Sequence, residues 1–157
     1  MLRQFFKDSF IYTIPTILSR SIAFLLLPLY TRIISPTEYG VLDLLAVFGS
    51  FVNLTVAFEI SQGIARYYAD GPTAESKVLY ASTAFWFTCF CYLIFAVLAL
   101  ANSDWLSKFI TGDTHYQMAL NIMVLYLTVN GLFYLVQNQF RWELRSKVYS
   151  LVSIVFM

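Results

Sequence analysis

Two opposite charges, Arg20 and Glu59, lie within apolar segments at residues 9–34 and 39–68. Each segment is longer than the roughly 20 residues that a transmembrane helix needs. A charge near the centre of such a helix costs about 2.5–3.5 kcal/mol on insertion scales, so it usually faces a partner, a cavity or a solute. A guanidinium can bind an anion through paired hydrogen bonds, and a carboxylate can orient that guanidinium or take up a proton.

The two charges lie at similar depths if their helices are antiparallel neighbours. Arg20 follows Tyr12 by eight residues, which is about 12 Å along a helix. Glu59 precedes Arg66 by seven residues, which is about 10 Å. A salt bridge between them is therefore possible. Two interpretations stay open: an ion pair that only joins two helices, or a cavity-lining role for at least one of the charges.

Polar residues recur at helical spacing on three of the apolar segments. They are Ser9, Thr13, Thr16 and Arg20; then Thr55, Glu59, Gln62 and Arg66; then Tyr126, Asn130, Tyr134, Gln137 and Arg141. Lipid cannot satisfy such stripes, so we predict a shared interior that holds water or a polar solute. The candidate substrate-binding residues are Arg20, Glu59, Arg66, Asn130, Tyr134 and Gln137. Residues 77–101 carry no such stripe, and we expect that helix to be more peripheral.

The composition is that of an integral membrane protein. Hydrophobic residues make up 59% of the chain and charged residues 12%, with a mean hydropathy of +0.69. A soluble domain has about 45–50% apolar and about 25% charged residues. The net charge is +1, and the lack of a basic run excludes nucleic acid as a partner.

Residues typical of catalysis are scarce. The sequence has no glycine-rich phosphate loop, no cluster of metal ligands and no nucleophile paired with a histidine. Cys89 and Cys91 point in different directions on a helix and are interpreted as inert thiols. We therefore expect no enzymatic activity, no cofactor and no metal.

The predicted fold class is an all-α membrane bundle. Four segments are long enough to span a bilayer: residues 9–34, 39–68, 77–101 and 116–140. We expect a fifth helix to begin near residue 146 and to be incomplete at residue 157. A short interfacial helix is possible within the polar loop 102–115. The whole chain, residues 1–157, is treated as one transmembrane domain.

Basic residues predict the orientation of the spans, because cytoplasmic loops carry an excess of Lys and Arg. With the N-terminus inside, seven basic residues flank the cytoplasmic side, and two, Arg32 and Lys108, flank the other. The seven are Arg3, Lys7, Arg66, Lys77, Arg141, Arg145 and Lys147. The remaining one is the intramembrane Arg20.

Residues 27–40 read LPLYTRIISPTEYG. This stretch resembles the signature PL-x-TR-x-LSP-x-E-[FY]-G of Wzx-type polysaccharide flippases, which belong to the superfamily of multidrug, oligosaccharidyl-lipid and polysaccharide exporters. Residues 63–68, GIARYY, resemble the end of the second helix in the same proteins.

The resemblance implies transport of an undecaprenyl-diphosphate-linked oligosaccharide across the bacterial inner membrane for surface polysaccharide synthesis. Flippases of this type have two lobes around a central cavity, where cationic side chains are thought to meet the diphosphate. Arg20 and Glu59 match the placement of intramembrane basic and acidic residues in relatives that flip peptidoglycan precursors. The implied partners are membrane lipids, the lipid-linked oligosaccharide and the remaining helices of a full-length transporter.

Because the family is much longer, we expect the chain to be the N-terminal part of such a protein, less than one lobe. Two alternatives stay open. A cation-coupled drug exporter of the same superfamily would use Glu59 to bind the coupling cation. A small helical membrane protein would instead form an oligomer or bind a partner.

The basic-residue asymmetry yields the first testable prediction. In a background that lacks Cys89 and Cys91, a cysteine placed in the loop 102–115 should react with an impermeant thiol reagent on intact cells. A cysteine within residues 70–76 or 141–147 should react only after permeabilisation. The reverse pattern would overturn the predicted orientation.

Overall fold

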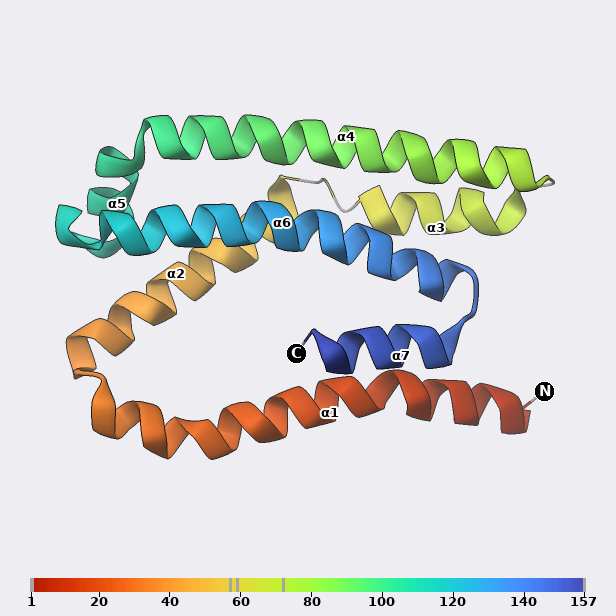
Figure 1. Cartoon of the computed structure of the whole chain (residues 1–157), viewed down its shortest axis with the longest axis horizontal. Coiled ribbons are helices and arrows are strands. Elements are labelled where there is room, and N and C mark those ends of the chain that lie inside the picture. Colours follow the sequence, from red (N-terminus) through yellow and green to blue (C-terminus); the bar gives the residue numbers. More distant parts are fainter. Residues whose placement is uncertain (1, 57, 59, 72, 157) are drawn as a thin grey trace. The chain divides into compact units, whose positions relative to one another are not determined.

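The computed structural model of the chain describes residues 2–56, 58, 60–71 and 73–156, without the side chains of residues 2–9 and Ala69. These residues form helices and no strand, which confirms the all-α prediction (Figure 1). In chain order the elements are α1 (Leu2–Ile33), α2 (Pro36–Thr55), α3 (Ile60–Asp70), α4 (Ala74–Ala101), α5 (Ser103–Thr111), η1 (Thr114–Tyr116), α6 (Gln117–Trp142) and α7 (Ser146–Val155).

Four stretches have the length and apolar character of membrane spans, as predicted. They are Phe10–Ile33, Pro36–Tyr68, Ala74–Ala101 and Thr114–Trp142. The fifth predicted segment forms α7, a shorter apolar helix. The short helix expected between the third and fourth spans is also present as α5. On it, the rings of Trp105 and Phe109 stack with their centroids 5.3 Å apart.

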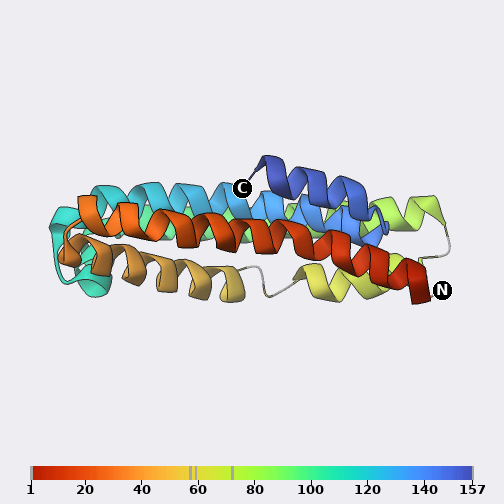
Figure 2. The ribbon, with the colours of Figure 1, turned by 90° about the horizontal axis from the view of Figure 1, so that it is seen from below.

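The chain divides into two compact units, which are described separately. The smaller unit comprises Met1–Pro36 and Gln137–Met157, and the larger one comprises Thr37–Val136. In the smaller unit, α7 packs along α1, as the two views in Figures 1 and 2 show. Tyr12 of α1 meets Tyr149 of α7 edge to face at 5.4 Å between ring centroids.

The core of the larger unit lies between α2, α4 and α6. Its buried residues are Val41 and Leu45 from α2, Ala96 and Ala99 from α4, and Leu120 and Val124 from α6. α4 is therefore central to this unit and not peripheral, contrary to the expectation from its lack of a polar stripe. Its buried face is Ala84, Thr88, Tyr92, Ala96 and Ala99, which follow helical spacing. Small side chains let neighbouring membrane helices approach closely, and this face supplies them.

The segment predicted as one helix at residues 39–68 forms two helices, α2 and α3 (Figure 2). Beyond the last residue of α2, the N–H of Val56 still donates to the carbonyl of Val52 at 2.9 Å. Phe58 then has a φ of 49°, in the left-handed region that non-glycine residues rarely adopt. The hydroxyl of Thr55 donates to the carbonyl of Phe51 at 2.8 Å, and such bonds often bend helices. Glu59 lies outside the described residues.

Local sequence sets the helix ends around α4 and α5. Thr73 and Ser76 form a capping box at the start of α4, in which the N–H of Ser76 donates to the Thr73 hydroxyl at 3.2 Å and the N–H of Thr73 donates to the Ser76 hydroxyl at 3.3 Å. Gly112 follows α5 with a φ of 81°, a conformation that only glycine adopts without strain.

Gly131 on α6 generates a prediction about stability. A Cβ atom there would overlap the ring of Tyr92, which is 2% exposed and is held at its other end by a hydrogen bond to Asn53. Overpacking of this kind costs about 1–3 kcal/mol, so we expect Gly131→Ala to lower the Tm of the purified protein in detergent.

Gly63→Ala on α3 is the matched control, because a Cβ atom there meets nothing within 4 Å. Its Tm should be unchanged or slightly higher, since alanine favours the helix more than glycine. A Tm of Gly131→Ala at or above that of the wild type would contradict the close contact between α4 and α6.

Candidate functional site

The larger unit contains a cavity of about 190 Å³ between α2, α3, α4 and α6. Six polar side chains line it: Asn53, Ser61, Thr88, Tyr92, Asn130 and Tyr134. They offer hydroxyl and amide groups, which both donate and accept hydrogen bonds. None of the described lining residues carries a charge.

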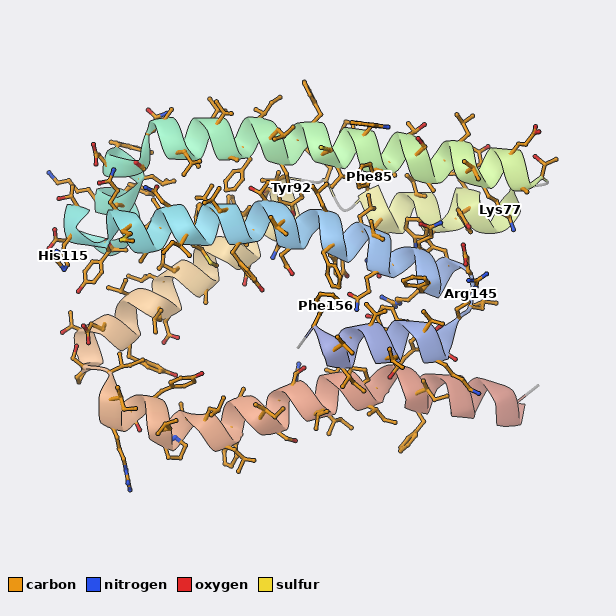
Figure 3. All side chains as sticks on the ribbon, viewed as in Figure 1. Lys77, Phe85, Tyr92, His115, Arg145 and Phe156 are labelled. Atoms are coloured by element: carbon orange, nitrogen blue, oxygen red, sulfur yellow. The ribbon has the colours of Figure 1, made fainter. Side chains whose placement is uncertain are left out.

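Tyr92 forms one wall of this cavity. Figure 3 shows its side chain between α4 and α6. Its hydroxyl donates to Oδ1 of Asn53 on α2 at 3.3 Å. The ring lies directly against Gly131 on α6, where no side chain blocks it. The absence of a side chain at residue 131 therefore makes room for the residue that joins three helices around the cavity.

Thr88 lies one helical turn before Tyr92 and is 1% exposed. Within the described structure, its Oγ1 atom has no hydrogen-bond partner. An unsatisfied buried hydroxyl costs about 1–3 kcal/mol, and most buried polar groups in proteins are paired. The hydroxyl is one of the groups that line the cavity.

Two of the predicted site residues, Asn130 and Tyr134, line this cavity. They lie four residues apart on α6, as their spacing in the polar stripe predicts. Arg66 is exposed on α3 and is not part of the lining. Glu59, the acidic partner expected for Arg20, lies outside the described residues, so an ion pair between the two stays a prediction.

The other predicted residues belong to the smaller unit. Arg20 is exposed on α1 and lies in a shallow groove with Ile17, Ser21 and Phe24. Among the described side chains of this unit, the ion pair is that of Arg145 with Glu143, at 3.0 Å, and Arg20 has no such partner. Figure 3 shows Arg145 at the connection between α6 and α7.

Gln137 is buried at 9% exposure, and its side-chain N–H donates to the hydroxyl of Ser153 on α7 at 2.7 Å. The hydroxyl of Ser153 in turn donates to the carbonyl of Tyr149 at 2.8 Å. Gln137 therefore joins the end of α6 to α7. Its predicted role in substrate binding stays a prediction.

Sequence reasoning missed four of the six polar lining residues: Asn53, Ser61, Thr88 and Tyr92. Asn53 and Ser61 lie on either side of the break between α2 and α3, which hydropathy does not reveal. Thr88 and Tyr92 lie on the buried face of α4 among alanines. Small residues at helical spacing mark a face that packs against other helices. A search for polar stripes does not detect such a face.

Within the described part of the chain, no three His, Cys, Asp or Glu side chains come together in a way that could hold a metal ion. Cys89 and Cys91 are partly buried free thiols on α4.

The family model of a polysaccharide biosynthesis protein matches residues 29–157. No curated protein and no solved structure matches the chain. The match covers all of α2 to α7 and includes most of the motif at residues 27–40, so it confirms the resemblance at the level of the family. The chain belongs to a family of polysaccharide biosynthesis proteins, and it carries four helices that are long and apolar enough to span a membrane.

Proposed function

We propose that this protein is a flippase that moves a lipid-diphosphate-linked oligosaccharide across the inner membrane of a bacterium, for the synthesis of a surface polysaccharide. The observation that carries this proposal is the family match over residues 29–157 in a chain with four apolar spans. Membership in a polysaccharide biosynthesis family sets the class of product, and the spans indicate that the protein acts within a membrane.

The cargo itself explains why such a protein needs charges inside its spans. Its isoprenoid tail is soluble in lipid, whereas its diphosphate and sugar hydroxyls lose their hydrogen bonds to water in hydrocarbon. Burying unpaired polar or charged groups costs several kcal/mol or more, so unassisted crossing is very slow. A transporter lowers this barrier by supplying charges and hydrogen-bonding groups at membrane depth.

Arg20 is suited to the diphosphate end of the cargo. It lies within the span Phe10–Ile33, and among the described side chains of its unit it has no ionic partner. Arginine stays charged in proteins and binds phosphate oxygens through two parallel hydrogen bonds. Glu59 has the complementary role in this proposal, in which its carboxylate orients Arg20 or takes up a coupling proton.

The decisive experiment separates binding of cargo from a purely structural ion pair. The gene is deleted in its host, and the full-length protein is restored as wild type or with Arg20→Leu and Glu59→Leu combined. Replacing both members of a buried ion pair by apolar residues is often nearly neutral for folding, so we expect normal abundance in the membrane. Export of surface polysaccharide should nevertheless fall about tenfold or more, because a hydrogen bond to a charged group is worth about 1.5–3 kcal/mol.

Two further variants complete the design. Arg20→Lys keeps the charge and loses the planar fork, so it should retain partial export. Lys108→Gln removes a positive charge from α5, outside the spans, and should export normally. Wild-type export by the double leucine variant at matched abundance would favour the structural ion pair over a role in cargo binding. If deletion of the gene itself left surface polysaccharide unchanged, the proposed function would be wrong.

A further inference from the structure

The cavity in the larger unit lies near the middle of two membrane spans. Thr88 is 14 residues from the start of α4 and 13 from its end, which is about 20 Å in either direction. Asn130 is 13 residues from the start of α6 and 12 from its end, which is a similar depth. The polar groups that line the cavity therefore lie at a depth where lipid offers them no hydrogen bonds.

Residues of α2 and α3 complete the lining of the cavity. Asn53 lies just before the break between these helices, and Ile60 and Ser61 lie just after it. The last carbonyls of a helix and the first N–H groups of the next have no intrahelical partners. Non-helical backbone at membrane depth is tolerated only where protein covers it or where it lines a hydrated cavity. The end of α2 and the start of α3 therefore contribute to one polar site through Asn53 and Ser61.

Thr88 contributes an unpaired hydroxyl group to this site. Its hydroxyl is almost fully buried, lines the cavity and lacks a partner within the described structure. The cavity of about 190 Å³ has room for roughly six water molecules at about 30 Å³ each. It is smaller than the roughly 300–1,000 Å³ of pockets for drug-sized ligands, so one ring of a larger solute fits better than a whole oligosaccharide.

The chemistry of the lining selects the kind of group. Hydroxyl and amide groups of Ser61, Thr88 and Asn130 suit neutral hydroxyl groups, whereas an ion would find no opposite charge among the described lining residues. Tyr92 and Tyr134 also line the cavity, and tyrosine combines an apolar ring with a polar hydroxyl group. A pyranose ring presents the same combination of hydroxyl groups at its edge and C–H groups on its face.

We propose that this cavity binds one neutral sugar residue of the transported oligosaccharide, with Thr88 as a hydrogen-bonding partner of a sugar hydroxyl. The proposal rests on the proposed function and adds to it a sugar site in a different unit from Arg20. Water provides the same hydroxyl chemistry when no sugar is bound, so the experiments below distinguish sugar from water.

The first experiment uses an isosteric change at Thr88. Thr88→Val removes the unpaired hydroxyl without changing the shape of the side chain, so the Tm in detergent should be equal to or above that of the wild type. Export of surface polysaccharide should fall roughly tenfold in the same variant, while Thr88→Ser, which keeps a hydroxyl, should export close to normally. A role in folding alone would lower the Tm and the export together.

Thr128→Val is the matched control, because its hydroxyl donates to the carbonyl of Val124 at 2.8 Å within α6 and does not line the cavity. It should export normally. Wild-type export by Thr88→Val, or a Tm below that of the wild type, would overturn the proposal. If that variant exported normally while the double leucine variant at residues 20 and 59 did not, the sugar site would fail and the proposed function would stand.

The second experiment measures access to the cavity and does not depend on export. In the full chain without Cys89 and Cys91, Asn130→Cys is treated in membrane vesicles with a charged methanethiosulfonate that does not enter lipid. We expect labelling of residue 130 and none of Phe90→Cys, whose native side chain is 62% exposed on the outer surface of α4. Glucose, galactose and N-acetylglucosamine are then tested as protectants, with glycine betaine as a solute that lacks hydroxyl groups.

At least one of the three sugars should slow the labelling of residue 130 severalfold, and betaine should not. Equal rates with all solutes would indicate a site for water only and would overturn the sugar assignment. No labelling of residue 130 would mean that the cavity is closed to the aqueous phase, which would overturn the proposal as well.

Discussion

Backbone hydrogen bonding in hydrocarbon is the constraint on which the structure depends. Lipid offers no partner to an N–H or a carbonyl group, so a chain that crosses a bilayer pairs these groups within itself. This constraint explains why the four apolar stretches that are long enough to span a membrane are helical. The same constraint makes the break between α2 and α3 informative, since interrupting a helix at membrane depth leaves backbone groups that need partners from elsewhere. The cavity lies between residues at the end of α2 and at the start of α3, on either side of this break.

Close approach of helices organises the larger unit. Apolar surface gains little from burial between helices that are already in lipid, so packing depends on shape and on small residues. Ala96 and Ala99 of α4 are the small residues in the core shared with α2 and α6. Gly131 is the small residue that lies against the ring of Tyr92. Tyr92 combines both kinds of interaction, because its ring fills the space at Gly131 and its hydroxyl bonds to Asn53. The same few residues, Tyr92, Gly131 and Asn53, therefore both pack the helices together and line or support the cavity.

Hydropathy was sufficient to predict the spans, since a run of about 20 apolar residues is typical of a helix that crosses a bilayer. The short helix expected within the loop 102–115 is likewise present, as α5. The break at residue 58 was not predicted, because residues 36–68 together pass as one apolar span and no proline or glycine lies within residues 54–62 to mark an interruption. The cavity was predicted in part: Asn130 and Tyr134 follow a polar stripe, whereas Thr88 is an isolated hydroxyl on a face of alanines. Whether such a residue packs or binds depends on which helices lie opposite, and one sequence does not contain that information.

The connection between α4 and α6 is tied together by its own side chains. The hydroxyl of Ser107, which is fully buried, donates to the carbonyl of Asp113 at 2.8 Å. The side chain of Gln117, at the start of α6, donates to the hydroxyl of Ser103, at the start of α5, at 2.8 Å. Leu106 and Ile110 pack against the buried core below. These contacts make the connection between α4 and α6 rigid. The third span and the adjoining part of the fourth would therefore move together as one unit during any conformational change.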